Sequence, residues 1–501
     1  MSAAGAASPT QRRAPERSQV FALFTAVMLP MFLAAVDQTL LATATPRIAS
    51  ELGHLGDSSW IAVAYLLAAT VMAPVYGRLG DRHGRRGALL GALAMFALGS
   101  LACGVAGSMT TLILARALQG LGGGGLMVLS QALIGELVPP IERPRYQAYF
   151  AIVFTASSVG GPVVGGLVVH YADWRWLFLA NLPLCAIAAW RVARLPAPSR
   201  ASRRAEPFDP LGLLLFVVSA CSALLWLSLA GHRFHWLSGT SALLLGLCAA
   251  GGVALARQQR RHPSPLLPLD VLRLPGVRWI CATVVCFAAS MFALVFLLPI
   301  HLQLGHGASA SDAGWQMLPL TGGLVLGSTI NSRITARTAM PSRTPPYGLA
   351  AAAIALAVLA LAPGASWIIG AAAAVIGLGF GTVMPAAQLS IQVLAGRARL
   401  GAAAALLSLT RSCGASLGTA AFAGLVFALL KLQPGQAEGQ SLHVEGLAPQ
   451  QIAHAFRIAY ASLAVFVAIG AWIASRVPVV RLTHWEDSLP APAEDSPARE
   501  R

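Results

Sequence analysis

Charged residues are scarce in this chain: they make up 11% of its 501 residues, whereas 56% of the residues are hydrophobic. Soluble proteins carry about 25% charged residues, so this composition excludes an ordinary water-soluble domain. Long apolar runs, such as 87–107 and 347–363, recur along the sequence. A helix needs about 20 apolar residues to cross the hydrocarbon, and a backbone in lipid must satisfy its own hydrogen bonds. These runs therefore predict membrane-spanning helices.

Cysteine is also sparse, with seven residues that all fall within apolar runs. No pair of them has the spacing of a zinc site with histidine partners, and no disulfide framework is implied. The sequence shows no nucleophile–base set and no cluster of metal ligands. We therefore expect no enzyme and no bound metal or cofactor.

Turn residues and charges divide the chain into 14 predicted membrane helices. Their ranges are 20–44, 59–77, 87–107, 110–136, 146–170, 174–192, 209–230, 239–256, 279–304, 312–332, 347–363, 366–394, 401–430 and 455–476. We expect an all-α membrane protein of two six-helix bundles plus two inserted helices. The predicted organisation is a tail 1–19, an N-terminal bundle 20–194, a linker 195–260 with the two extra helices, a C-terminal bundle 261–478 and a tail 479–501.

The formal net charge of +16 follows the predicted topology. The basic residues lie in short segments between apolar runs and not along one face, which argues against a nucleic-acid partner. With 14 helices, the loops on one side hold 28 of the Lys and Arg residues, and the opposite loops and helix ends hold five. By the positive-inside rule, both termini are predicted to be cytoplasmic. Low lysine with high alanine and arginine indicates a GC-rich bacterial genome, and hence a bacterial inner membrane.

Two segments of the sequence repeat at an offset of 257 residues. Residues 120–134 read GLGGGGLMVLSQALI and residues 377–391 read GLGFGTVMPAAQLSI, with glycines, a methionine, a glutamine and an isoleucine in register. The match aligns the predicted helices 110–136 and 366–394. Parallel repeats of this kind build transporters whose site lies between the two halves, although channels also contain repeats.

A polar decapeptide, Gly77-Arg-Leu-Gly-Asp-Arg-His-Gly-Arg-Arg86, joins the predicted helices 59–77 and 87–107. Its glycines permit a tight turn, and Asp81 can pair with an arginine or accept hydrogen bonds at a helix N-terminus. An ordinary positive-inside turn is the alternative. The string resembles the signature loop of the major facilitator superfamily. The resemblance implies the major facilitator fold and assigns the signature to Gly77, Asp81, Arg82, Gly84, Arg85 and Arg86.

Further strings extend this resemblance along the chain. Residues 114–120 resemble the superfamily motif of the fourth helix, and the segment Gly161-Pro-Val-Val-Gly-Gly166 resembles the motif associated with antiporters. The antiporter motif comprises Gly161, Pro162, Gly165 and Gly166; simple close packing is the alternative. The strings at 36–39, 44–46, 174–176 and 181–183 resemble the 14-span drug:proton antiporter branch, the EmrB/QacA type. This branch implies a proton-coupled exporter of small amphipathic molecules, for which a periplasmic adaptor and an outer-membrane channel are possible partners.

Asp37 is the one acid that lies well inside a predicted helix. A carboxylate at the centre of a membrane helix costs about 2.5–3.5 kcal/mol on insertion scales, and such groups are functional by default. Because a poorly hydrated environment favours the protonated form of a carboxyl, Asp37 can carry a proton. A structural acid bonded to a neighbouring helix is the alternative. The resemblance implies that Arg116 also takes part in proton coupling; the alternative is an arginine that orders backbone carbonyls.

Aromatic, methionine and glutamine side chains in the predicted helices suit varied apolar ligands, although each can also pack between helices or face lipid. The candidate pocket residues are Tyr65, Gln119, Met127, Phe154, Phe287, Met291, Phe292, Trp315 and Gln388. Arg411 joins this set as a second buried charge, which can face an aqueous vestibule or an anionic substrate group, or serve a structural role.

Three functions are compatible with these observations. The leading hypothesis is export of amphipathic molecules by alternating access, with proton uptake at Asp37. An exporter of one defined endogenous metabolite has the same fold and differs in a narrow substrate profile. The segment Ser332–Arg337 stands where the second half would repeat the signature loop, but it lacks the acid and the glycines. That loss is compatible with a membrane receptor or scaffold that does not transport.

Overall fold

The structure is a computed structural model that describes residues 17–52, 59–195, 209–229, 238–262, 269–308, 310–361, 366–396, 399–430 and 449–482. Most of the two predicted tails, 1–19 and 479–501, lies outside these ranges, as do residues 196–208 and 230–237 of the predicted linker. Within the described ranges, every element of regular structure is a helix.

Seven helices come from the first part of the chain. They are α1 (Arg17–Leu52), α2 (Ser59–His83), α3 (Arg85–Gly104), α4 (Met109–Leu137), α5 (Arg143–Tyr171), α6 (Trp176–Leu179) and α7 (Asn181–Ala193). Two more helices follow, α8 (Pro210–Leu229) and α9 (Gly239–Arg261).

The second part of the chain begins with a short helix that leads into a long one. Its helices are α10 (Leu269–Arg273), α11 (Val277–His306), α12 (Ala310–Trp315), α13 (Leu318–Thr338), the 3-10 turn η2 (Pro341–Arg343), α14 (Thr344–Leu361), α15 (Ser366–Gly381), α16 (Val383–Ala395), α17 (Leu400–Leu429) and α18 (Pro449–Ser475).

Eleven helical segments of the described residues are long and apolar enough to cross a membrane. Of the other predicted spans, 146–170 and 312–332 overlap α5 and α13, and 209–230 matches the shorter apolar helix α8. The count of 14 therefore stays a prediction. Several boundaries are wrong: α2 and α9 continue to His83 and Arg261, past the predicted ends 77 and 256, and the range 312–332 joins the end of α12 to α13. Arg333 and Arg337, which we expected in a loop, lie in the last turns of α13. Apolarity does not mark this end, because α13 carries polar residues before it stops.

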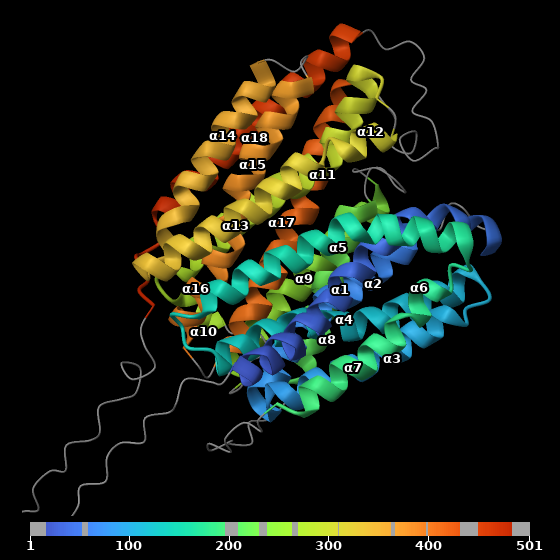
Figure 1. The fold of residues 1–501 in the computed structure, drawn as a ribbon, viewed down its shortest axis with the longest axis vertical. Helices are drawn as coiled ribbons and strands as arrows, with labels where there is room; N and C mark the ends of the chain where they lie inside the picture. The colour runs from blue at the N-terminus through green and yellow to red at the C-terminus, as the bar shows by residue number, and fades with distance from the viewer. Residues whose placement is uncertain are drawn as a thin grey trace, which may run out of the picture.

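Figure 1 shows α1–α7 gathered in one half of the molecule and α11–α18 in the other. The buried apolar side chains follow the same division. One core lies within residues 271–474, and two others lie within residues 26–195. The halves meet where α2 packs on α17 and α5 packs on α13. The α8–α9 pair packs beside this seam, where Phe216 and Leu255 are buried against Val71 of α2.

Glycines on α4 and α15 let their neighbours approach closely. A Cβ atom on Gly124 would collide with the carbonyl oxygen of Ala69 in α2, and one on Gly122 would collide with the backbone of α3. In the second half, a Cβ atom on Gly381 would collide with the carbonyl of Leu324 in α13, and one on Gly379 with the backbone of α14. Small residues permit this kind of backbone approach in membranes. The two repeated segments thus contact their neighbours in the same order.

Candidate functional site

The site is built around a buried ion pair between α1 and α4. Asp37 and Arg116 are only 2% and 1% exposed, and Arg116 Nη1 lies 2.6 Å from Asp37 Oδ2. A charge inside a membrane bundle needs a partner of opposite sign, because an unpaired buried charge is strongly unfavourable. Asp37 and Arg116, both candidates from the sequence, therefore form one buried ion pair.

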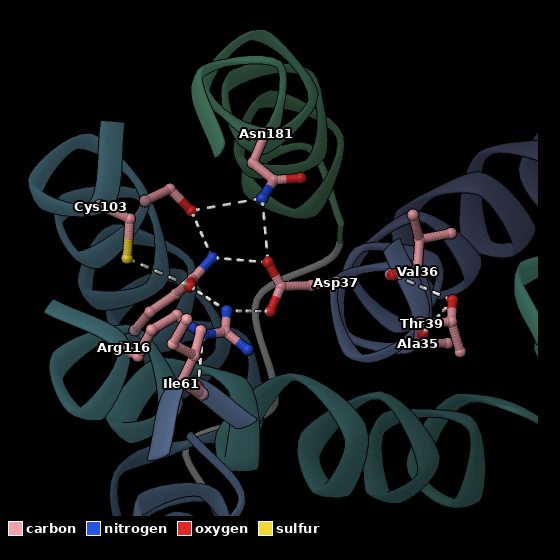
Figure 2. A network of polar contacts seen from close by, with 10 residues as sticks. Ala35, Val36, Asp37, Thr39, Ile61, Cys103, Arg116 and Asn181 are labelled. Atoms are coloured by element: carbon pink, nitrogen blue, oxygen red, sulfur yellow. Dashed lines mark hydrogen bonds and ion pairs between the residues drawn. The ribbon is translucent and has the colours of Figure 1, made fainter. Parts of the chain in front are cut away.

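The other carboxylate oxygen of Asp37 accepts hydrogen bonds from two amides. Gln119 Nε2 donates at 2.8 Å, and Asn181 Nδ2 of α7 donates at 3.3 Å (Figure 2). Gln119 Nε2 also donates to Ser100 Oγ of α3 at 2.8 Å, while Gln119 Oε1 accepts from Arg116 and, at 3.7 Å, from Cys103 Sγ. Four helices of the first half thus contribute side chains to the carboxylate and its partners.

The guanidinium of Arg116 is also held by α2. Its Nε donates to the carbonyl oxygen of Ile61 at 3.1 Å, and its Cζ lies 4.4 Å from the centre of the Tyr65 ring. The ring of Phe178 lies on the guanidinium at 5.8 Å. Cation–π contacts of this kind stabilise a desolvated guanidinium. Arg116 therefore keeps favourable contacts that do not involve Asp37.

Next to the ion pair, α1 is fastened to α5. The hydroxyl of Thr39 donates to the carbonyl oxygen of Ser157 at 2.8 Å. A Cβ atom on Gly161 would collide with Thr39 Oγ1, and one on Gly165 would collide with the carbonyl oxygen of Leu40. Two glycines of the predicted antiporter motif thus pack on α1 within one turn of Asp37. A Cβ atom on Gly166 would meet nothing within 4 Å, and the side chain of Pro162 lies outside the described residues.

The predicted signature loop forms a second polar cluster, at the junction of α2 and α3. Gly84 has a φ of 100°, a conformation that favours glycine, and connects the two helices. Asp81 Oδ1 lies 2.6 Å from Arg85 Nη2, and Arg85 Nη1 lies 2.9 Å from Glu136 Oε2 at the end of α4. These ion pairs therefore join α2, α3 and α4 at this junction.

Two further arginines of this loop occupy different positions. Arg86 Nη1 donates to the carbonyl oxygen of Leu195 at 2.6 Å, just beyond the end of α7. Its Nη2 donates to the carbonyl oxygen of Ala193. Arg82 lies in the last turn of α2 and is partly exposed. Arg86 therefore ties the signature loop to α7, whose first residue, Asn181, bonds Asp37.

The same loop reaches across to the second half. Asp81 Oδ1 and Oδ2 accept hydrogen bonds of 2.9 Å each from the backbone N–H groups of Gly401 and Ala402, in the first turn of α17. Gly77 and Gly401 face each other so closely that a Cβ atom on either would collide with the other's carbonyl oxygen. At this end the two halves are in direct contact.

The comparisons with known proteins agree with this architecture. The family model described as Major Facilitator Superfamily matches residues 27–419. The chain belongs to the major facilitator superfamily. Solved structures give the same fold: the human organic anion transporter MFSD10 (TETRAN) superposes with a TM-score of 0.65 at 15% identity, over 92% of this chain and all of that chain. This family and this fold are those of membrane transporters rather than of enzymes.

Three proteins of known sequence are similar to this chain over much of its length. The uncharacterised MFS-type transporter Rv1877 of Mycobacterium tuberculosis is 34% identical over 83% of this chain and 61% of its own length, so this chain spans less than two thirds of that relative. The multidrug transporter protein MdtP of Bacillus subtilis is 31% identical over 79% of this chain and 73% of its own length. The rubrofusarin-specific efflux pump aurT of Gibberella zeae is 32% identical over 64% of this chain and 60% of its own length.

The candidate pocket residues of this superfamily member are distributed over both halves. Tyr65 and Gln119 belong to the Asp37 network. Met127 and Phe154 pack against the core of the first half. These four side chains thus stabilise the half that carries the ion pair.

In the second half, the candidates differ in how exposed they are. Phe287 is buried edge-on against Phe380 at 5.6 Å, and Met291 packs against the same core. Phe292 and Trp315 are 38% and 69% exposed. Gln388 is buried on α16, and Arg411 is partly buried on α17. A substrate pocket formed by this set stays a prediction.

Sequence reasoning missed three residues of the network. Asn181 belongs to the string 181–183, which resembles the 14-span antiporter branch. This string was the one signal in the sequence that could have identified Asn181 as a site residue. Ser100 and Cys103 lie in an apolar run, where a hydroxyl or thiol carries no spacing signal.

A second buried acid, Asp209, lies outside this network. It caps the start of α8, where its carboxylate accepts hydrogen bonds from Gln258 Nε2 at 3.1 Å and from the backbone N–H of Gly212 at 2.8 Å.

Proposed function

We propose that this transporter is a proton-coupled antiporter that exports small amphipathic molecules across a bacterial inner membrane. It works by alternating access, with 14 membrane helices in two six-helix bundles and two inserted helices, and with both termini in the cytoplasm. The observation that carries the proposal is the buried Asp37–Arg116 pair at 2.6 Å. An ion pair enclosed on all sides in a membrane bundle is expensive to build and changes its bonding when one proton is added.

The proton step acts on the carboxylate of Asp37. When a proton binds Oδ2, the carboxyl becomes neutral and its attraction to Arg116 weakens. Arg116 keeps the carbonyl of Ile61 and the ring of Tyr65, so it remains in place on α2 and α4. The charge-assisted bonds that fix α1 to α4 are weakened, and α1 is free to shift. When the proton leaves, the pair forms again.

Movement of α1 reaches the second half through α5. Thr39 bonds α1 to α5, and α5 packs on α13. The halves also meet where Asp81 bonds the start of α17. In the proposed topology that end faces the cytoplasm, so the described conformation is closed on the cytoplasmic side. A proton can drive the change between conformations only because its affinity differs between them.

The relatives support the export direction and the substrate class. MdtP is a multidrug transporter, and aurT is an efflux pump. The EmrB/QacA resemblance adds a periplasmic adaptor and an outer-membrane channel as candidate partners. The specificity of aurT for one compound also favours a second candidate function, export of one defined metabolite. A panel of chemically varied substrates separates the two, because a single accepted compound favours the second.

The test is a transport assay in proteoliposomes with an imposed pH gradient. The wild-type chain is expected to move a substrate against its gradient and to move protons in the opposite direction when substrate is present. Asp37→Asn is expected to abolish transport driven by the pH gradient. Asp173→Asn, which changes an exposed acid on the same side of the proposed membrane, is the matched control and retains transport. An Asp37→Asn protein that still accumulates substrate with unchanged proton dependence overturns the proposal.

A further inference from the structure

A groove lined by three arginines lies between the inserted helices and the second half. Its volume is about 450 Å³, and its lining residues are Ala256, Arg260, Leu272, Arg273 and Arg278. Arg260 comes from the end of α9, Arg273 from α10 and Arg278 from the start of α11. Three separate helices therefore bring one guanidinium each to the same hollow.

Positive charge exceeds negative charge in the sequence around this groove. All three guanidinium groups belong to exposed residues, and no salt bridge joins any of them to another residue in the part of the chain that the structure describes. The sequence from 256 to 278 contains five arginines and a single acid, Asp270. Like charges in one hollow repel, so an anion bound among them lowers the energy.

The groove also has features of a site at the membrane–water interface. Ala256 and Leu272 give it apolar walls. Val253, 52% exposed, precedes Ala256 and Arg260 on the same face of α9, because residues three and seven positions apart align on a helix. Beside Arg278, the exposed Trp279 meets Trp472 edge-on at 6.3 Å. Tryptophan gathers at the level of the lipid headgroups.

We propose that this groove binds the phosphate of an anionic phospholipid headgroup, with an acyl chain along α9. Guanidinium groups match phosphate oxygens with paired hydrogen bonds, and basic pockets between membrane helices on the cytoplasmic side suit anionic headgroups. The apolar walls and Val253 favour a lipid over a free phosphate ion. A lipid bound here bridges α9 to α10 and α11, and so links the inserted helices to the second half. This inference does not depend on proton coupling.

The test uses the purified full-length chain in detergent and titrates phosphatidylglycerol, phosphatidylcholine with the same acyl chains, or inorganic phosphate. The readouts are the midpoint of thermal unfolding and the lipids retained in native mass spectrometry. Phosphatidylglycerol is expected to raise the midpoint in a saturable manner. Substitution of glutamine for Arg260, Arg273 and Arg278 together is expected to weaken its apparent affinity at least tenfold. The matched control changes three exposed arginines elsewhere, Arg333, Arg337 and Arg343, to glutamine and keeps the wild-type affinity.

Each remaining outcome decides the proposal. Equal lipid retention by the two triple variants means non-specific binding and overturns it. A rise in the midpoint with inorganic phosphate as large as that with lipid also overturns it, because the ligand is then the free ion. If the triple variant does not fold, the single variants Arg273→Gln and Arg278→Gln replace it. Each is then expected to lose part of the affinity, and no loss in either overturns the lipid site.

Discussion

The carboxylate of Asp81 accepts a hydrogen bond of 2.9 Å from the backbone N–H of Gly401, a residue 320 positions later in the chain. The next N–H, of Ala402, donates to the other oxygen at the same distance. The first N–H groups of a helix have no partner within the helix, and the helix dipole favours a negative charge beside them. Asp81 of one half thus caps α17 of the other half and stabilises the contact between the two halves.

The first prediction concerns this cap. Asp81→Asn removes the negative charge from the α17 terminus and the ion pair with Arg85. The loss is expected to be about 1–2 kcal/mol, which changes the ratio of closed to open conformations about five- to thirtyfold. Double electron–electron resonance between spin labels at Leu79 and Arg399 measures the change. The control Glu142→Gln removes an exposed acid at the same end of the molecule. Identical distance distributions for Asp81→Asn and the wild type contradict the capping role.

The second prediction concerns the buried pair. Asp37→Asn leaves Arg116 charged and without its anion, and removing one partner of a buried pair costs about 3–5 kcal/mol. Asp37→Asn combined with Arg116→Gln removes the remaining charge, so the double variant is expected to unfold at a higher temperature than Asp37→Asn alone. Thermal unfolding in detergent gives the double-mutant cycle. Strictly additive losses would show that the two side chains do not interact energetically.

The third prediction concerns the two glycine-rich helices. Gly124→Ala and Gly381→Ala each place a Cβ atom against a backbone carbonyl, of Ala69 and Leu324 respectively. Both are expected to lower the unfolding temperature, because backbone cannot move aside cheaply. Gly91→Ala on α3 meets nothing within 4 Å and serves as the control. It is expected to be neutral or to stabilise, since alanine favours a helix over glycine by about 1 kcal/mol. Equal effects at all three positions contradict the close approach.

The fourth prediction concerns the packing of α5 on α1. Gly161→Ala directs a methyl group at the Thr39 hydroxyl and is expected to reduce substrate transport several-fold in proteoliposomes, because α1 is displaced beside Asp37. Gly166→Ala has open space and is expected to transport at the wild-type rate. Adding Thr39→Ala to Gly161→Ala removes the worst contact and is expected to restore part of the rate. If Gly166→Ala is impaired as much as Gly161→Ala, the segment matters for another reason.

Much of the charged architecture could be predicted from the sequence. Charges are rare in apolar runs, so Asp37 and Arg116 stood out as candidate functional residues before their distance was known. Gln119, three residues after Arg116 on α4, also bonds Asp37. The signature loop fixed the positions of Asp81 and Arg85, but not the bond from Asp81 to Gly401, which depends on how the two halves dock.

The apolar side chains could not be placed in the same way. In a soluble helix, the polar face shows which side is buried, but in a membrane both the lipid-facing and the interior faces are apolar. Phe287 and Phe292 lie close together in the sequence, and one is buried while the other is 38% exposed. Nothing in the residue type distinguishes them. The rotation of α11 about its axis, set by its contacts with α17 and α18, decides which one faces inward.

The network around Asp37 draws its bonding partners, among the described residues, from the chain before Pro183. In the proposed mechanism, a proton bound at Asp37 therefore changes bonding within the first half and not directly in the second. The change must then reach the second half through the packing of α2 on α17 and of α5 on α13. In that mechanism, uncharged residues at the contact between the halves can tune the conformational change without altering the Asp37 network.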